Sequence, residues 1–173
     1  LLVGCVGMAE AQQPGKVPRI GVLAEGSPSS QTFRIRIESF LQGLRELGYA
    51  EGKNVTIEYR FAEGRRERLL GLAAELVRLK VDVIVAAGGT AVARALKEAT
   101  STIPIVTAHG GNPVARGIIA SLARPGGNIT GLTTIAPDLA GKRLELLKET
   151  VPRLTRVGVL WDPAGRGSAA VFK

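Results

Sequence analysis

The sequence predicts an α/β protein with a doubly wound parallel sheet flanked by helices. After Pro18, strand-like and helix-like segments alternate, as in a sheet whose parallel strands are joined by helices. Of the 173 residues, 45% are apolar and only 4% are aromatic, which suits a helix-covered sheet better than a sandwich. The clearest unit is 81–97, where a β-branched run stops at two glycines and restarts with helical spacing.

The expected elements follow one another at short intervals. Five short apolar or β-branched runs, each bounded by turn residues, predict strands at 19–24, 54–60, 81–86, 103–108 and 129–133. Apolar residues at helical spacing predict helices at 33–47, 67–79, 91–99, 114–122 and 138–151. If the strand order is the common 2-1-3-4-5, it reverses between the first and third strands. Ligands are then expected at the carboxyl ends of these strands.

The turn Gly88-Gly89-Thr90 is the first candidate binding element. Two glycines allow a tight turn, and Thr90 is predicted as the N-cap of the following helix. Backbone N–H groups at a helix start favour a carboxylate or phosphate. A purely structural turn and cap is the competing interpretation, and the residues of the turn alone do not decide between them.

Two further loops are expected beside this turn. Glu25 and Ser27 lie in the polar loop after the first strand, and His109 and Asn112 lie in the turn-rich loop after the fourth. Each also has a local interpretation: a solvated charge for Glu25, a loop residue for His109 and a helix cap before Pro113 for Asn112. Together the loops predict a binding surface of amides, hydroxyls and one side-chain amide.

Composition argues against several function classes. The formal net charge is +8, but Lys and Arg are spread among Glu, and the one dense cluster, 65–68, has no interleaved aromatic residues. A solvated helix start is therefore favoured there over a polyanion site, and no nucleic-acid partner is expected. With one His, one Cys, no G-x-S-x-G motif and no Walker A lysine, we expect neither an enzyme nor a metal or cofactor site.

The first residues resemble the end of a secretory signal. Residues 1–8 are apolar and small, and Ala9-Glu10-Ala11 fits a cleavage site after Ala11. A bacterial lipobox at 2–5, with lipidation of Cys5, and a simple apolar arm are the alternatives. We expect a protein exported to the periplasm or another extracytoplasmic space.

The expected organisation is a signal remnant at 1–11, a linker at 12–18, an α/β lobe at 19–152 and the start of an incomplete second lobe at 153–173. The second lobe is expected because the strand-like segment 156–161 repeats the pattern of 19–24.

An ordered series of segments resembles the ABC transporter substrate-binding proteins of the tryptophan/tyrosine type. The series comprises the segments 18–23, 44–49, 52–55, 87–90, 121–131 and 142–149. Among them, S-L-A-R-P-G-G-N-I-T-G at 121–131 is the most specific. This resemblance implies a lobe of the type I periplasmic-binding-protein fold. Two such lobes would close on a small solute, an amino acid or related carboxylate, and deliver it to a membrane permease.

The resemblance also implies roles for residues. Thr90 and the amides after Gly88 and Gly89 would hold the solute carboxylate, and the loop of Ser27 would line the cleft. Asn112 stands where relatives commonly have Asp, so a possible partner for a solute ammonium is lost. A sensory or regulatory ligand-binding module of the same fold is the alternative, although the signal-like start argues against it. An enzyme would need catalytic residues from the missing C-terminal lobe.

Overall fold

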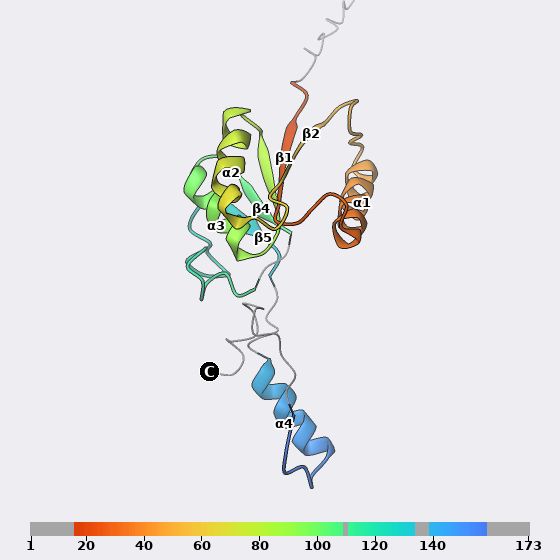
Figure 1. Ribbon diagram of the computed structural model, residues 1–173, viewed down its shortest axis with the longest axis vertical. Helices are drawn as coiled ribbons and strands as arrows, with labels where there is room; N and C mark the ends of the chain where they lie inside the picture. Colours follow the sequence, from red (N-terminus) through yellow and green to blue (C-terminus); the bar gives the residue numbers. More distant parts are fainter. Residues whose placement is uncertain (1–15, 109–110, 134–138, 159–173) are drawn as a thin grey trace, which may run out of the picture.

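The computed structural model describes residues 16–108, 111–133 and 139–158, and its centre is a five-stranded parallel sheet. The strand order is β2-β1-β3-β4-β5, which confirms the expected reversal between the first and third strands (Figure 1). The strands are β1 (Arg19–Ala24), β2 (Thr56–Phe61), β3 (Val83–Ala87), β4 (Ile105–Thr107) and β5 (Ile129–Gly131).

Helices cover both faces of the sheet. The helices α2 (Leu69–Arg78) and α3 (Thr90–Ala99) lie on one face, and α1 (Gln31–Glu46) lies on the other (Figure 1). A short 3-10 turn, Arg66–Arg68, leads into α2. This arrangement is the doubly wound α/β architecture that the sequence predicts.

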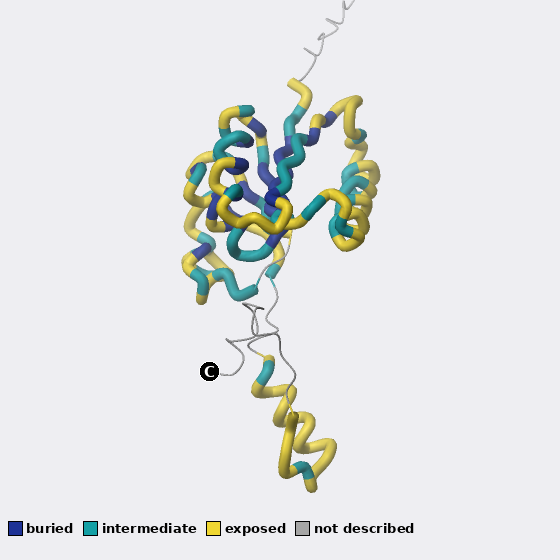
Figure 2. Tube along the Cα trace, in the orientation of Figure 1, coloured by how far each residue is buried: buried dark blue, intermediate teal, exposed yellow. Residues whose placement is uncertain are grey.

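The main core lies between the sheet and the pair α2 and α3. Leu23, Leu76, Ile84, Leu96 and Ile105 are fully buried there. Alternate residues of β3 divide between the faces: Ile84 and Ala86 are buried, whereas Val83, Val85 and Ala87 are half-buried and pack with the α1 side. Figure 2 shows the buried residues concentrated in the strands and in the two helices beside them. The α2 and α3 face therefore carries most of the packing.

The helix α1 packs less closely than its apolar stripe predicts. None of its residues is buried; Phe40, Leu41 and Leu44 are partly buried against Ile20, Val22, Val55 and Ile57. Its amino-terminal half, with Phe33 and Ile37, instead borders a hollow beside the sheet.

The expected helix at 114–122 is wrong: this segment consists of turns and bends. Gly117 has a φ of +67°, which ends any right-handed helix there. Its carbonyl and that of Ile118 accept hydrogen bonds from Lys97 Nζ, at 3.0 and 2.9 Å. Tertiary bonding to α3 therefore replaces the helical ladder that the apolar spacing favours.

The remaining helix, α4 (Ala140–Thr150), lies apart from the sheet (Figure 1). Its leucines, including Leu144 and Leu147, are exposed. Residues 156–158 carry no strand, and the rest of the expected strand at 156–161 lies outside the described residues, as do Cys5 and the signal-like residues. The domain boundaries stay predictions. No helix in the described part of the chain is long and apolar enough to cross a membrane.

Candidate functional site

The turn between β3 and α3 lies at the carboxyl edge of the sheet, at the switch in strand order. Gly89 is the N-cap of α3, with φ −73° and ψ −164°, and Thr90 is the first helical residue. The predicted N-cap is therefore wrong by one position, because the extended backbone that a cap requires falls on Gly89. Val92 and Ala93 donate their backbone N–H groups to the Gly89 carbonyl, at 3.1 and 3.4 Å.

The start of α3 presents unused hydrogen-bond donors. Among the described residues, the backbone N–H groups of Thr90 and Ala91 have no acceptor, and neither does the Thr90 hydroxyl. Both residues are half-buried. Free amides at the positive end of a helix dipole are suited to a carboxylate. The predicted anion-binding geometry is therefore available at this turn.

Gly88 allows this turn to lie close to β1 and α3. A Cβ at position 88 would overlap Val92 Cγ2 and would lie 3.2 Å from Val92 Cβ and 3.3 Å from Glu25 Cβ. Val92 is fully buried, so it has little room to retreat. The glycine at 88 thus fixes the approach of the first turn of α3, whereas a Cβ at position 89 would meet no atom within 4 Å.

Three hollows meet at this turn, and Gly89 lines all of them. A cavity of about 100 Å³ lies beside Thr90, Thr107 and Thr133. A larger hollow of about 330 Å³ lies between the sheet and α1 and is bordered by Phe33 and Phe40. An open groove of about 850 Å³ runs past Thr90 and the side chains of Arg66, Arg94 and Arg116.

Glu25 shares this edge of the sheet with Gly88, Gly89 and Thr90. It borders the α1 hollow and the open groove, and its Oε1 accepts a hydrogen bond from Arg66 Nε at 2.5 Å. Its charge is thus paired within the chain. The residue pattern that indicated Glu25 did not identify this partner.

Ser27 and Asn112 take part in local turns instead. The Ser27 hydroxyl lies 2.8 Å from the Ser29 hydroxyl and accepts a bond from the Ser29 amide. Asn112 Oδ1 accepts bonds from the amides of Val114 and Ala115, at 3.2 and 3.0 Å. These are the bonds of the predicted cap, but they close a turn because no helix forms at 114–122. His109 lies outside the described residues.

Two threonines near the carboxyl ends of β4 and β5, Thr107 and Thr133, line the small cavity beside Thr90, but they are not among the site residues that the sequence predicts. Thr107 is the last residue of β4, and its hydroxyl donates to the Thr130 carbonyl at 3.2 Å. Thr133 donates from its hydroxyl to the Gly111 carbonyl at 3.3 Å. The expectation that ligands meet the carboxyl ends of strands covers Thr107 at the end of the fourth strand, and extended to the fifth strand it would also have covered Thr133.

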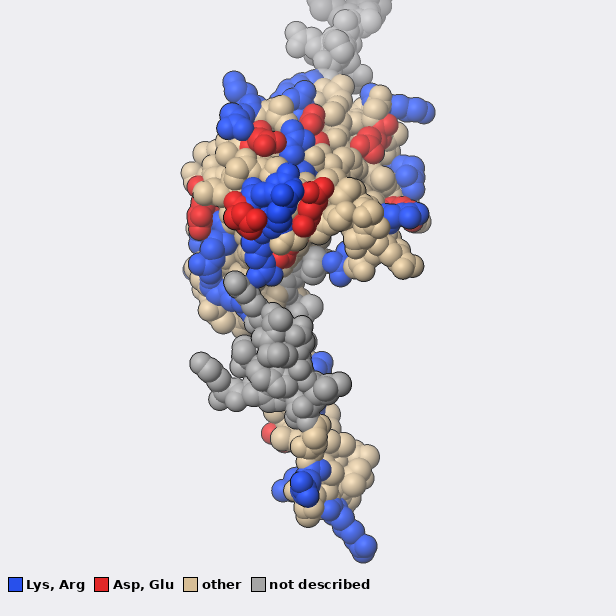
Figure 3. Space-filling model, viewed as in Figure 1, with Lys and Arg blue, Asp and Glu red and all other residues tan. Residues whose placement is uncertain are grey.

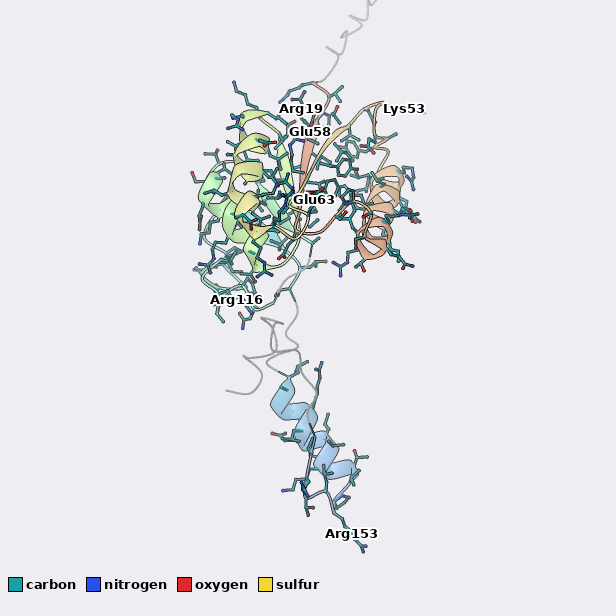
Figure 4. All side chains as sticks on the ribbon, viewed as in Figure 1. Arg19, Lys53, Glu58, Glu63, Arg116 and Arg153 are labelled. Carbon is teal, nitrogen blue, oxygen red and sulfur yellow. The ribbon has the colours of Figure 1, made fainter. Side chains whose placement is uncertain are left out.

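The arginine cluster at 65–68 is paired with acidic residues of the same chain. Arg65 and Arg68 donate to Glu63 Oε2 at 3.1 and 3.0 Å, and Arg66 donates to Glu25. Figure 3 shows acidic and basic side chains interspersed on the face of the lobe that is in view. Figure 4 labels Glu63 in the same view. This pairing favours the solvated interpretation over a polyanion site. The described residues also contain no group of three His, Cys, Asp or Glu side chains that could hold a metal ion.

A parallel α/β lobe with anion-suited amides at its switch point is typical of proteins that bind small solutes. The family model described as "ABC transporter substrate binding protein" matches residues 29–173. The chain belongs to this family, which confirms the resemblance drawn from the sequence. The family is one of solute-binding, non-enzymatic proteins.

Individual relatives support the same assignment. The chain is 32% identical over 125 residues to a tyrosine-binding protein of Clostridioides difficile, covering 72% of this chain and 35% of the relative. A structure from Streptococcus pneumoniae in complex with L-Trp is 28% identical with a TM-score of 0.64, covering 78% of this chain and 44% of that one.

A ligand-free, open structure of a Clostridium difficile substrate-binding protein with adhesive properties is 26% identical with a TM-score of 0.71. That match covers 90% of this chain and 51% of the other. The shared architecture confirms the predicted lobe of the type I periplasmic-binding-protein fold. The chain spans about a third of the length of its curated relative and about half of these structures.

Proposed function

We propose that the complete protein is the extracytoplasmic solute receptor of an ABC importer. It holds a small solute, an amino acid or related carboxylate, between two lobes and delivers it to a permease in the membrane. Membership of the substrate-binding family supports this proposal. So do relatives that are named for tyrosine binding or solved with L-Trp.

The observation that carries the proposal is the set of unused donors at the start of α3. The solute carboxylate accepts hydrogen bonds from the amides of Thr90 and Ala91 and from the Thr90 hydroxyl, beside the glycines of the turn. Glu25, in its pair with Arg66, borders the same space. Ser27, His109 and Asn112 are proposed as outer contacts from the neighbouring loops.

The second lobe is proposed to follow the present one, beginning within 153–173. A single lobe contacts a solute from one side only, so the isolated 173-residue chain binds weakly. Closure of two lobes would bury most of the solute surface, as sites for small molecules usually do.

Weak binding calls for a method that detects millimolar affinities residue by residue. We would titrate the ¹⁵N-labelled 173-residue chain with single L-amino acids and follow the amide resonances by NMR. The amides of Gly89, Thr90 and Ala91 are expected to shift in a saturable way. Loss of a hydrogen bond to a charged group corresponds to about a tenfold loss of affinity, which is expected for Thr90→Val.

Thr56→Val is the matched control. Thr56 is exposed and begins β2, so it lies at the amino ends of the parallel strands, whereas the candidate site lies at their carboxyl ends. It should leave the affinity unchanged. If no amino acid or related carboxylate shifts the amides of the turn, the proposed function is wrong. Equal affinities for the Thr90→Val variant and the unchanged chain would remove Thr90 from the site.

A further inference from the structure

We propose that the cavity beside Thr90, lined also by Ala93, Ile118 and Leu132, receives the side chain of the solute and selects a compact aliphatic group over an aromatic ring. This inference rests on the proposed function, because it assumes that the solute carboxylate lies at the start of α3. It adds the class of amino acid to the proposed function.

The lining of the cavity is aliphatic. Its apolar walls come from α3, from the turn segment after β4 and from the end of β5, and the described residues among them include no aromatic side chain. Ala93 and Ile118 are buried, at 5% and 4% exposure, so this part of the wall is fixed by the core. An aliphatic wall with a rigid base favours an aliphatic occupant through close packing.

The polar groups of the lining are largely satisfied within the protein. The hydroxyls of Thr107 and Thr133 donate to the backbone carbonyls of Thr130 and Gly111. The hydroxyl of Thr90 has no acceptor among the described residues, and neither has that of Thr130, which is exposed. The half-buried hydroxyl that is still unused is therefore the one where the carboxylate is expected, and the buried apolar part of the wall suits a hydrocarbon side chain.

The size of the cavity sets the class of side chain. Its volume is about 100 Å³. A protein cavity that holds benzene measures about 150 Å³, so a phenol or indole ring exceeds the present space. A branched chain of three or four carbons, as in valine or leucine, is the largest group that this volume accommodates.

The hollow on the other side of the turn provides the contrast. It is larger, at about 330 Å³, and Phe33 and Phe40 border it, so an aromatic ring would fit there. However, Gly88 and Gly89 line that hollow and Thr90 does not. Thr90 also borders the open groove, but the side chains there include Arg66, Arg94 and Arg116. An apolar side chain of a solute held by Thr90 is therefore directed into the smaller cavity.

The test compares L-valine and L-leucine with L-tyrosine and L-tryptophan in the NMR titration of the 173-residue chain. The aliphatic amino acids are expected to bind at least fivefold more tightly. Their resonance shifts should spread from the amides of Thr90 and Ala91 to those of Ala93 and Ile118.

Leu132→Ala widens the cavity without removing a core residue, because Leu132 is 73% exposed. This variant is expected to reduce the preference for valine over tyrosine at least threefold. Leu47→Ala is the control: Leu47 is 75% exposed and borders none of the three hollows. It should leave the preference unchanged.

The outcomes separate this inference from the proposed function. Tyrosine or tryptophan binding as tightly as valine overturns the inference and leaves the function standing, as do shifts that map to Phe33 and Phe40. An unchanged preference in Leu132→Ala also overturns it. If none of the four amino acids perturbs the turn, while other carboxylates do, the solute is not an aliphatic amino acid and the inference is again overturned.

Discussion

Substitution of Gly88 by alanine tests the geometry that brings the first turn of α3 to the carboxyl edge of the sheet. The new Cβ would overlap Val92 Cγ2 and lie 3.2 Å from Val92 Cβ, in a fully packed region. Valine in a helix has essentially one χ1 rotamer, so its side chain cannot turn away. Overpacking of this kind costs about 2 kcal/mol, which lowers the Tm of a chain of this size by roughly 4–8 °C.

A double-mutant cycle identifies the contact responsible. Val92→Ala removes the overlapping methyl group and by itself lowers stability by about 2 kcal/mol through lost burial. In that background, Gly88→Ala should cost little, giving a coupling of at least about 1 kcal/mol. Urea denaturation of the four proteins measures each difference.

Gly89→Ala is the matched control, because a Cβ there meets no atom within 4 Å. Any cost from the weaker N-cap preference of alanine should be the same with and without Val92. Equal losses for Gly88→Ala in both backgrounds would refute the steric argument. The absence of a Cβ at position 88 would then not be the reason that the first turn of α3 packs so closely.

Three further predictions concern stability. Gly131→Ala is expected to destabilise strongly, because Gly131 has a φ of +137° and a Cβ would overlap the Thr107 carbonyl and lie 2.6 Å from the Thr107 amide nitrogen. Gly127→Ala is the control, since a Cβ there meets no atom within 4 Å. If urea denaturation gives the two variants the same free energy of unfolding, the prediction is wrong. Burial, and then the neighbouring Glu51 carboxylate, raise the pKa of Tyr59 to about 12. The neutral hydroxyl is favoured in the folded state, so its contribution is present below about pH 10 and is lost as the pH rises from about 10 to about 12; Tyr59→Phe should flatten this part of the stability profile. Hydrogen bonds from Lys16 and from the Arg19 amide lower the pKa of Asp82, so its contribution is lost as the pH falls through the lowered value; thermal unfolding of Asp82→Asn should show a weaker acid dependence, and an identical slope would contradict the assignment.

Local sequence patterns determined the strands and most helices because their apolar residues recur at a regular period. The β-branched run before Gly88 becomes β3, and its two-sided burial follows from helices on both faces. The same kind of pattern is misleading at 114–122, where apolar spacing favours a helix. Gly117 at positive φ and the bonds from Lys97 override that local preference.

The candidate site divides in the same way. Residue type alone indicated the turn at 88–90, because the first backbone N–H groups of any helix lack acceptors within that helix, whatever the rest of the fold. It could not show that Glu25 is paired with Arg66, 41 positions away.

The sequence by itself determined the fold class, and with the common strand order assumed it predicted the edge of the sheet at which a solute would bind. These follow from short-range periodicity and from the geometry of parallel strands. Only the tertiary structure decided which side chains share a cavity there, how large that cavity is and which charges are already paired. Such facts depend on contacts between residues that are distant in the chain, and no local pattern records them.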